Sequence, residues 1–321
     1  MEIDVSIIIP TYKRSEMIGR AINSVLHQTY KNIEVIVVDD NDEDSEYRKI
    51  TEEKVKQYLN LPNFTYLKHN KNKNGAVARN TGIKKAKGKY IGFLDDDDEF
   101  LKEKIEMQVN ALKNTDDKIG AVYCGYNVLR GNKVISQITL NDKGDLFEKL
   151  LLMNWGTGSG SNVLFKRSVF ESIGLFDEEL TRHQDWDILL RMFYKFEIID
   201  IPQIGLNIYK DSRINIPNAD KFVEIKKYFI GKFYDRIKAL PEYIENEILQ
   251  KHCLELCTAY LKNKNYKEAK KYYKIADKYK KIDNKNKVSM MLVVIFVNLP
   301  FKEFLLVWCG KIIDKFRIVK F

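Results

Sequence analysis

Apolar residues in the first hundred positions fall into short runs that each end at a polar residue or a turn. Val5–Ile9 and Ile33–Val38 are rich in β-branched residues and show no alternation of apolar and polar positions. Such runs are typical of parallel strands that are covered on both faces. Between them, apolar residues at helical spacing run from Ile18 to Leu26, and we expect Ser15 to cap that helix. The pattern predicts a β-α-β unit.

The same kind of pattern continues toward residue 100. We expect a helix over residues 45–60, a third strand over 63–67, and a turn at 72–82 that opens another helix. A further apolar run, 90–94, is followed by five consecutive acids, 95–99. This order predicts an α/β fold with a Rossmann-like, mainly parallel central sheet flanked by helices. The acids then lie at the carboxyl edge of the sheet, where such folds bind ligands.

The middle of the chain predicts a different order of elements. A helix is expected over 101–113, and strands over Ile119–Tyr126 and Lys133–Ile138, separated by a turn at Gly131-Asn132. The loop Gly156–Ser161 has two open interpretations. It forms part of a ligand pocket, since glycine lets the backbone approach a ligand, or it is a plain linker.

The last third of the chain predicts helices only. Residues 221–240 and 243–261 show helical patterns, and residues 260–279 resemble one helix-turn-helix unit of the tetratricopeptide type, which needs neighbours to bury its apolar face. We therefore expect a domain over residues 1–216, with halves 1–100 and 101–216, and a helical region over 217–321.

An apolar segment, residues 288–309, lies in this helical region. Asn298, Pro300 and Lys302-Glu303 interrupt it, so each piece is shorter than the roughly 20 residues that span a bilayer. Flanking lysines and Trp308 favour a segment that lies in a membrane interface, and a buried helical hairpin is the alternative.

Charge is unevenly distributed along the chain of 321 residues, whose formal net charge is +9. Residues 220–321 hold 23 Lys and Arg against 12 Asp and Glu, whereas residues 1–219 hold 31 against 33. This argues against nucleic-acid binding and favours an anionic membrane surface as a partner. The four cysteines form no Cys-x-x-Cys pair and no secretory signal is present, so we expect a cytoplasmic protein, peripheral on the inner face of the cell membrane.

The loop after the first strand argues against two common nucleotide-binding sites. Residues 10–14 contain no glycine for approach to a pyrophosphate, and no Walker A motif is present. Tyr12 has a ring that can border a nucleobase, and Asp39 a carboxylate for base or ribose, although both are equally compatible with structural roles. The helix that opens near Gly75 offers its amide-bearing N-terminus to an anion, with Arg79 one turn in.

The acidic run predicts a cation site. Adjacent carboxylates repel one another unless a cation shares them, and oxygen-only ligands suit Mg²⁺ or Mn²⁺ better than zinc. A solvated acidic turn is the alternative.

Four segments in this order, Val5–Tyr12, Val37–Asp40, Gly75–Asn80 and Phe93–Asp98, resemble the nucleotide-sugar half of inverting family-2 glycosyltransferases with the GT-A fold. The resemblance makes the solvated turn the weaker alternative. It implies that a UDP-sugar contacts Pro10, Thr11, Tyr12, Arg14, Asp39, Asp40, Gly75, Arg79, Asp95 and Asp96. It also implies that Asp97 coordinates the Mn²⁺ or Mg²⁺ at the diphosphate, with the register within Asp95–Asp98 open by one residue.

A second group of segments extends the resemblance to about residue 216. Residues 174–178, Gly-Leu-Phe-Asp-Glu, match a family motif, and Asp185 occupies the position of the catalytic base. Gln184 stands where the family has glutamate, which leaves the role of that first acid open. Asp187 faces another side of the helix and is expected to cap it or to pair with a charge. His183 is expected to form a polar wall rather than to bind metal or act in catalysis.

Two departures from the family bear on the reaction. The stretch 208–214 lacks the histidine that members often place near the metal, so Asp211 substitutes for it or the metal lacks that ligand. The Gln-x-x-Arg-Trp motif of the processive synthases is absent, which favours the addition of a single sugar.

These expectations predict a metal-dependent inverting glycosyltransferase. Asp185 removes the proton of the acceptor hydroxyl while metal and Arg79 neutralise the UDP leaving group. The expected acceptor is a saccharide or a lipid-linked saccharide, in the synthesis of capsule, O-antigen or exopolysaccharide. The alternatives are a non-catalytic sugar-nucleotide-binding protein, against which Asp185 argues, and a nucleotidyltransferase, which needs a triphosphate loop absent from residues 10–14.

Overall fold

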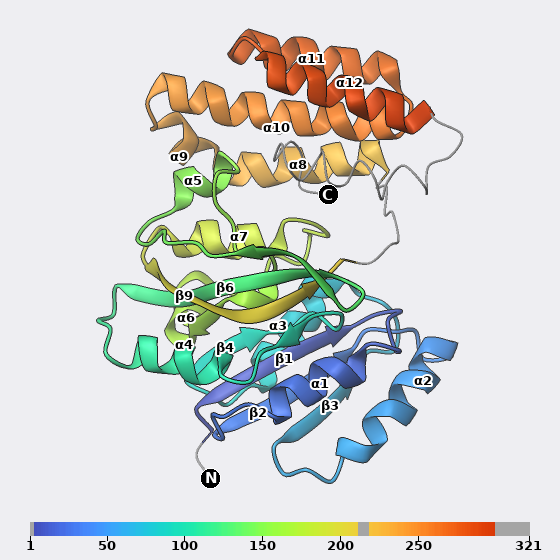
Figure 1. Ribbon diagram of the computed structural model, residues 1–321, viewed down its shortest axis with the longest axis vertical. Helices are drawn as coiled ribbons and strands as arrows, with labels where there is room; N and C mark the ends of the chain where they lie inside the picture. The colour runs from blue at the N-terminus through green and yellow to red at the C-terminus, as the bar shows by residue number, and fades with distance from the viewer. Residues whose placement is uncertain (1–2, 211–217, 299–321) are drawn as a thin grey trace. The chain divides into compact units, whose positions relative to one another are not determined.

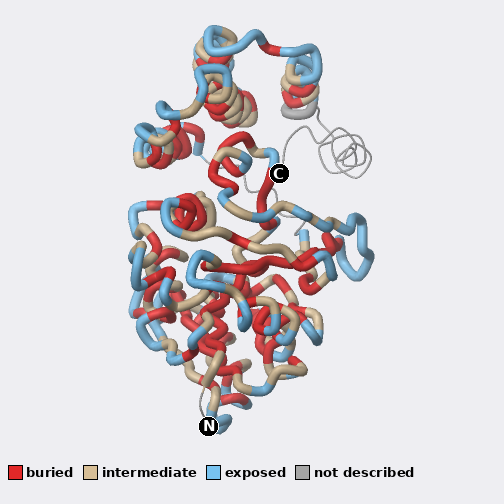
Figure 2. The backbone as a smooth tube through the Cα atoms, turned by 90° about the vertical axis from the view of Figure 1, so that its left-hand side faces the viewer, coloured by how far each residue is buried: buried red, intermediate tan, exposed pale blue. Residues whose placement is uncertain are grey.

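The computed structural model describes residues 3–210 and 218–298. The chain divides into two compact units, Met1–Ser212 and Arg213–Phe321. The first unit combines a sheet with helices, and the second consists of helices in its described part (Figure 1). In Figure 2 the strands of the first unit are mainly buried, whereas turns and outer helix faces are exposed.

A mixed sheet forms the centre of the first unit. Within the described residues it has nine strands, in the order β3-β2-β1-β4-β8-β6-β9-β5, and β7 pairs with β6. Neighbours from β3 to β4 are parallel, as are β6 and β9, whereas the remaining pairs are antiparallel. The strands are β1 (Val5–Thr11), β2 (Ile33–Asp39), β3 (Phe64–Lys68), β4 (Tyr90–Phe93), β5 (Glu99–Phe100), β6 (Ile119–Arg130), β7 (Lys133–Ile138), β8 (Leu164–Lys166) and β9 (Glu197–Tyr209). The predicted α/β fold is confirmed.

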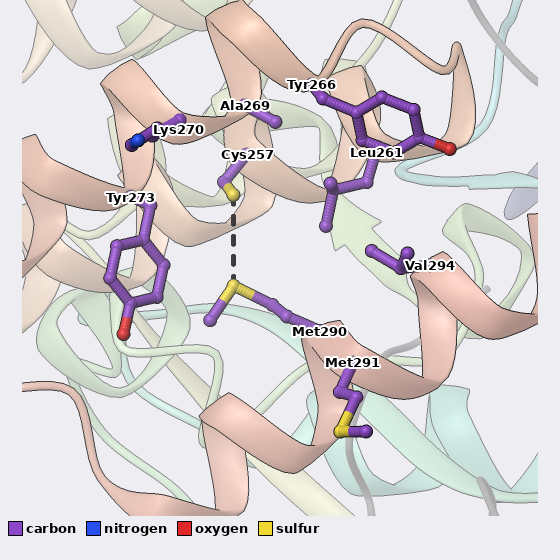
Figure 3. Close-up of a pocket in the computed structure, with 9 residues that line it drawn as sticks. All are labelled: Cys257, Leu261, Tyr266, Ala269, Lys270, Tyr273, Met290, Met291 and Val294. Carbon is purple, nitrogen blue, oxygen red and sulfur yellow. Dashed lines mark hydrogen bonds between the residues drawn. The ribbon is translucent and has the colours of Figure 1, made fainter.

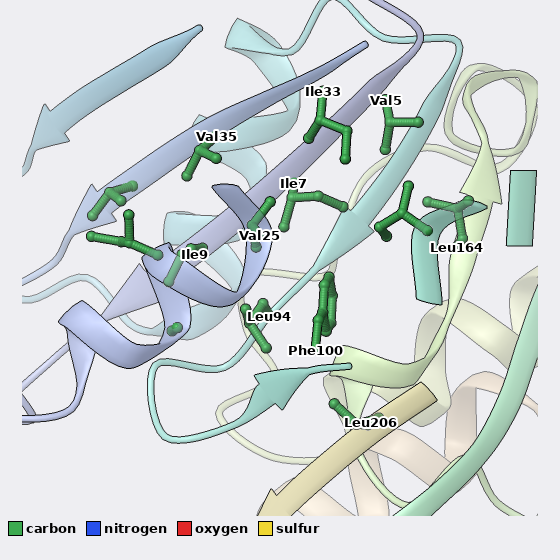
Figure 4. Close-up of a cluster of buried hydrophobic side chains, with 14 of the residues drawn as sticks. Val5, Ile7, Ile9, Val25, Ile33, Val35, Leu94, Phe100, Leu164 and Leu206 are labelled. Atoms are coloured by element: carbon green, nitrogen blue, oxygen red, sulfur yellow. The ribbon is translucent and has the colours of Figure 1, made fainter. Parts of the chain in front are cut away.

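Strand β1 is covered on both faces, which is why its sequence needs no polar alternation. Ile7 and Ile9 are buried in one cluster with Val25 of α1 (Ile18–Leu26) (Figure 4). The other face meets α3 (Gly75–Lys85), where a Cβ at Gly82 would lie 2.4 Å from Cγ2 of Ile8. Only glycine permits this approach of helix to sheet.

The remaining helices of the first unit differ from the prediction at two boundaries. They are α2 (Glu46–Val55), η1 (Lys56–Tyr58), α4 (Lys104–Lys113), α5 (Phe147–Leu151), η2 (Gly160–Asn162), α6 (Arg167–Ile173) and α7 (Gln184–Met192). Ser15 does not cap α1, because the helix begins after Met17 and Ser15 Oγ donates to the carbonyl of Tyr47 at 3.1 Å. Helix α4 begins at Lys104 rather than 101, because residues 99–100 pair with β9.

The second unit contains α8 (Ala219–Lys232), α9 (Tyr234–Lys238), α10 (Glu242–Lys262), α11 (Tyr266–Tyr279) and α12 (Asn284–Asn298). The single helix predicted over 221–240 is broken at Phe233. Helices α10 and α11 form the predicted pair, and the rings of Tyr260 and Tyr272 stack between them at 5.6 Å.

The apolar segment 288–309 is described only in part. Residues 288–298 belong to α12, and the rest, like Asp211, lies outside the described residues. Among the helices that the structure describes, none has both the length and the apolar character needed to cross a bilayer.

Candidate active site

The acidic run after β4 alternates between accessible and buried carboxylates. The side chains of Asp95 and Asp97 are 31% and 16% exposed, whereas Asp96 and Asp98 are only 4% and 3% exposed as whole residues. Burial raises the pKa of Asp96 to about 7, and it also raises the pKa values of Asp97 and Asp98. The run therefore presents two reachable carboxylates, two residues apart, at the edge of the sheet.

Hydroxyl groups hold the two buried carboxylates. Thr11 Oγ1 donates to Asp96 at 2.7 Å, and Ser161 and Ser159 donate to Asp98 at 2.7 and 2.8 Å. These bonds tie the end of β1 and the glycine-rich loop to the acids. The loop 156–161 is thus part of the site and not a plain linker.

A buried polar network fixes the position of this loop. The side-chain amide of Asn162 donates to the carbonyls of Cys124 and Thr157 at 2.8 and 2.9 Å. The backbone carbonyl of Asn162 accepts hydrogen bonds from Gln108 at 2.8 Å and from Lys104 at 3.3 Å. Lys104 is only 1% exposed, and burial lowers its pKa to about 8. The sequence carried no signal for this network, because its members lie on four separate elements or loops.

Two arginines lie at Asp97. Arg14 donates from Nη1 to the Asp97 carboxylate, and Arg20 donates from Nη2 to the Asp97 carbonyl at 2.6 Å. The guanidinium of Arg20 lies 3.6 Å from the centre of the Tyr209 ring, whose hydroxyl donates to Glu99 at 2.8 Å. Arg20 and Tyr209 were missed in the sequence, because they are unremarkable members of a helix and a strand until the sheet brings β9 beside β5.

Arg79 connects the acidic run to helix α7. Its Nη2 donates to Asp95 Oδ1 at 2.7 Å, and its Nη1 donates to Gln184 Oε1 at 2.8 Å. A Cβ at Gly75 would lie 3.0 Å from Arg79 Nη1, so glycine leaves room for this bridge. Since Gln184 is the first residue of α7, the bridge brings Asp185 to the same edge of the sheet.

Asp185 lies half-buried on the first turn of α7. Burial raises its pKa, and the positive charge of Arg79 acts in the opposite direction. The glycine-rich loop approaches it, since a Cβ at Gly160 would lie 3.8 Å from Asp185 Cβ. Asp187 points elsewhere and pairs with Arg191 at 2.8 Å, which confirms it as a charge partner.

The residue before α7 has a left-handed backbone. His183 has a φ of 61°, and its ring lies 5.4 Å from that of Trp186. It therefore sets the start of the helix that carries Asp185.

The two aspartates at the end of β2 are held within the protein. Asp39 accepts hydrogen bonds from Tyr66 at 2.5 Å and from Asn41, and it pairs with Arg48 at 2.9 Å. Asp40 accepts from the backbone amide of Asn74 at 3.0 Å. Asp40 thereby shapes the turn before α3, while Asp39 closes the end of β2.

The loop after β1 leaves one aromatic ring accessible. Pro10 and Thr11 still belong to β1, and Tyr12 is 38% exposed. Lys13 has a φ of 57°, and its backbone amide donates to Asn41 at 2.8 Å. This backbone turn sets the direction of the loop just after Tyr12 at the sheet edge.

Asn80 joins two of the motifs singled out in the sequence. Its amide nitrogen donates to the carbonyl of Phe176 at 2.9 Å, and its oxygen accepts from the amide of Phe176 at 2.9 Å. Asn80 also donates to Glu178 at 2.9 Å. The segment before α7 is therefore fastened to α3.

The accessible carboxylates fit a hard divalent cation. No group of three or more His, Cys, Asp or Glu side chains within 3–210 and 218–298 is arranged to hold a metal. Mg²⁺ and Mn²⁺ in nucleotide sites need only one or two carboxylates, because the nucleotide phosphates supply the other oxygens. Asp97, with Asp95 beside it, meets that requirement.

The profile of Glycosyl transferase family 2 matches residues 6–174, and the chain belongs to this family. Its fold is the GT-A fold of glycosyltransferases.

Individual relatives and solved structures agree with this assignment. The chain is 36% identical over 193 residues to an uncharacterized glycosyltransferase, RP339, of Rickettsia prowazekii. The aligned region covers 59% of this chain and 58% of that protein. The chain is 30% identical over 259 residues to the Escherichia coli UDP-Glc:alpha-D-GlcNAc-diphosphoundecaprenol beta-1,3-glucosyltransferase WfgD, which covers 78% of this chain and 96% of that protein. The matches thus span little more than half of the Rickettsia relative and nearly all of WfgD.

Two solved structures share the fold. Staphylococcus aureus TarS 1-349, in complex with UDP-GlcNAc, aligns with a TM-score of 0.64 at 18% identity over 91% of this chain and 87% of that one. The mannosyltransferase PcManGT of Pyrobaculum calidifontis, in complex with GDP-Man and Mn²⁺, aligns with a TM-score of 0.54 at 18% identity over 99% and 83%.

Proposed function

We propose that the enzyme transfers one sugar from a UDP-sugar to a hydroxyl of a saccharide or lipid-linked saccharide, with inversion at the anomeric carbon. The observation that carries this proposal is the Arg79 bridge, which joins Asp95 to Gln184 and so brings Asp185 to the edge that holds the acidic run. A single displacement needs the nucleotide-sugar and the catalytic general base at the same edge of the sheet.

The donor side of the proposed site uses the residues around β1, β2 and β4. The ring of Tyr12, beside Pro10 and Thr11, borders the uracil at the end of β2, where Asp39 and Asp40 shape the floor. Asp95 lies toward ribose and sugar, whereas Asp96, which was expected there too, is buried and held by Thr11 beneath them. Asp97 would hold Mn²⁺ or Mg²⁺, which when bound supplies Lewis-acid neutralisation of the diphosphate.

Arginines act on the same diphosphate. Arg14 and Arg79, with the N-terminal amides of α3 at Gly75, offer positive charge to the leaving UDP. Arg14 contacts the Asp97 carboxylate, so its guanidinium lies beside the proposed diphosphate site and would turn to phosphate oxygens if Asp97 held the cation.

Asp185 is the proposed general base. Its carboxylate accepts the proton of the acceptor hydroxyl while that oxygen attacks the anomeric carbon from the face opposite UDP. Its raised pKa makes it a stronger base than an exposed aspartate. A UDP-α-sugar then gives a β-linkage.

The relatives support a proposal for the acceptor and the setting. WfgD is named for transfer from UDP-Glc to a diphosphoundecaprenol-linked sugar. We infer the same classes of donor and acceptor here, in the synthesis of a capsule, O-antigen or exopolysaccharide. Such an acceptor places the enzyme in the cytoplasm, on the inner face of the cell membrane, with an anionic lipid surface as its partner.

Release of UDP from a panel of UDP-hexoses and UDP-N-acetylhexosamines, with Mn²⁺ or with chelator, tests the donor and the metal. One donor should be hydrolysed slowly, and chelator should stop the reaction. Asp185→Asn should lower turnover by about 10²- to 10⁴-fold without weakening UDP binding, whereas the control Asp117→Asn, on an exposed turn, should leave turnover unchanged. Near-normal turnover of Asp185→Asn, or an α-linked product, contradicts the proposal.

A further inference from the structure

The second unit carries an open apolar groove of about 230 Å³ between α10, α11 and α12. Figure 3 shows Cys257 and Leu261 of α10 facing Met290 and Val294 of α12, with Tyr273 of α11 at one side. The sulfur atoms of Cys257 and Met290 lie 3.8 Å apart. Apolar side chains form most of its lining.

A stripe of exposed apolar side chains on α12 continues this groove. Val288, Met291 and Ile295 are 53%, 65% and 43% exposed, and their spacing of three and four residues places them on one face of the helix. Met291 also lines the groove. Contiguous exposed apolar surface of this kind marks an interaction site.

Lysines border the same surface. Lys267, Lys270 and Lys274 are exposed and share one face of α11 by their spacing, and Lys270 lines the groove. Lys287, four residues before Met291, lies on the face of the α12 stripe. Residues 266–298 hold nine lysines against three acids. The apolar surface therefore sits in a strongly positive field.

We propose that this surface, the groove together with the α12 stripe, docks on an anionic lipid bilayer. The acyl chains pack against the stripe and enter the groove, while the lysines reach the lipid phosphates, as in helices that lie in a membrane interface. Charge complementarity favours a bilayer, which presents phosphate and acyl chain together in any orientation. The docking rests on the proposed function, which includes an anionic membrane as partner. The groove and the α12 stripe are the surface that makes this contact.

Co-sedimentation of the full chain with vesicles tests the docking. The protein should bind vesicles that contain phosphatidylglycerol more tightly than pure phosphatidylcholine vesicles, and added salt should weaken binding. The pair Met291→Glu and Ile295→Glu should lower partitioning by at least about tenfold. The pair Lys270→Glu and Lys274→Glu should lower it by about fivefold or more per lysine.

Two controls introduce the same glutamate at an exposed aromatic residue and at an exposed lysine elsewhere. Tyr243, the first turn of α10, is 72% exposed, and Lys56 in the first unit has a side chain 73% exposed. Tyr243→Glu and Lys56→Glu should bind vesicles like the unaltered protein. All variants should release UDP at the unaltered rate, which shows that a loss of vesicle binding is not a loss of fold.

Three results overturn the proposal. In the first, the stripe variants bind vesicles as well as the unaltered protein. In the second, Leu305→Glu abolishes binding while the stripe variants do not. In the third, the stripe variants convert a dimer to a monomer in sedimentation velocity and keep their vesicle binding. If UDP release fails in every sample while stripe-dependent vesicle binding is found, the docking surface stands and the proposed transfer fails.

Discussion

Gln184 is the residue through which the acidic run and the proposed base are coupled. Its side-chain oxygen accepts from Arg79, and its nitrogen donates to the carbonyl of Leu180 at 2.6 Å. A glutamate at this position would keep the contact with Arg79 but could not donate to Leu180. The amide therefore lets one side chain satisfy two partners without adding charge beside Asp185.

Gln184→Glu should move the acid limb of the pH profile of kcat/KM to higher pH. The new negative charge raises the pKa of Asp185, and because the deprotonated form is the base, activity is lost at a higher pH on acidification. A negative charge on the residue next to Asp185 should raise the pKa of Asp185 by about one unit. Rates measured across the acid limb for both proteins check this.

A second substitution at this position separates the effect of charge from the loss of the contact with Arg79. Gln184→Ala removes the bond to Arg79 without adding charge, so it should lower the rate at all pH values and leave the limb closer to its original position. An acid limb that moves to lower pH in Gln184→Glu would show that Asp185 is not the titrating base.

At the scale of helices and strands, the sequence predicted those elements whose burial is recorded in their own residues. Strands β1, β2 and β4 were predicted because they are buried on both faces and so consist of uninterrupted apolar runs. The start of α4 was missed because β5 owes its existence to pairing with β9, over a hundred residues later. Periodicity records local burial, not partners distant in the chain.

The sequence likewise pointed to some residues of the candidate site and not to others. Asp95, Arg79 and Asp185 stood in recognisable segments, and the structure brings them together. Ser159 was expected only as a member of a loop with two open interpretations, and Arg20 could not be found, because it becomes a neighbour of the acids only through the path of its helix. Asp40 was expected at the ligand, whereas its bonds to the turn before α3 became visible only in three dimensions.

The Asn80 clamp between α3 and the segment before α7 makes a prediction about stability. Asn80→Ala would leave the buried amide and carbonyl of Phe176 without these partners, which should cost about 1–3 kcal/mol per unsatisfied group. Urea unfolding measures this loss. Asn114→Ala, at the exposed end of α4, is the control and should change stability by less than about 0.5 kcal/mol. If both substitutions lowered the free energy of unfolding equally, the Asn80 hydrogen bonds would not stabilise the fold.

At the scale of the whole molecule, ligand binding should appear as thermal stabilisation. UDP at about 100 times its dissociation constant should add about 2.7 kcal/mol. Mn²⁺ should add a further increment only when UDP is present, because the described carboxylates need the nucleotide's oxygens to complete a metal site. Differential scanning fluorimetry with UDP, Mn²⁺ and both measures these increments.

Asp97→Asn distinguishes the metal from the nucleotide. It should remove the Mn²⁺ increment and keep stabilisation by UDP, whereas Asp116→Asn, on an exposed turn, should keep both. An undiminished Mn²⁺ increment in Asp97→Asn would place the metal on another residue.

Lys104 gives the first unit an internal chemical reporter. Burial lowers the pKa of its amine to about 8 and also shields the amine from acylating reagents, since the residue is only 1% exposed. Reagent therefore reaches it only in molecules whose core has opened, whereas surface lysines react without such opening. The rate of acylation at Lys104 accordingly counts openings of the folded core in the absence of denaturant.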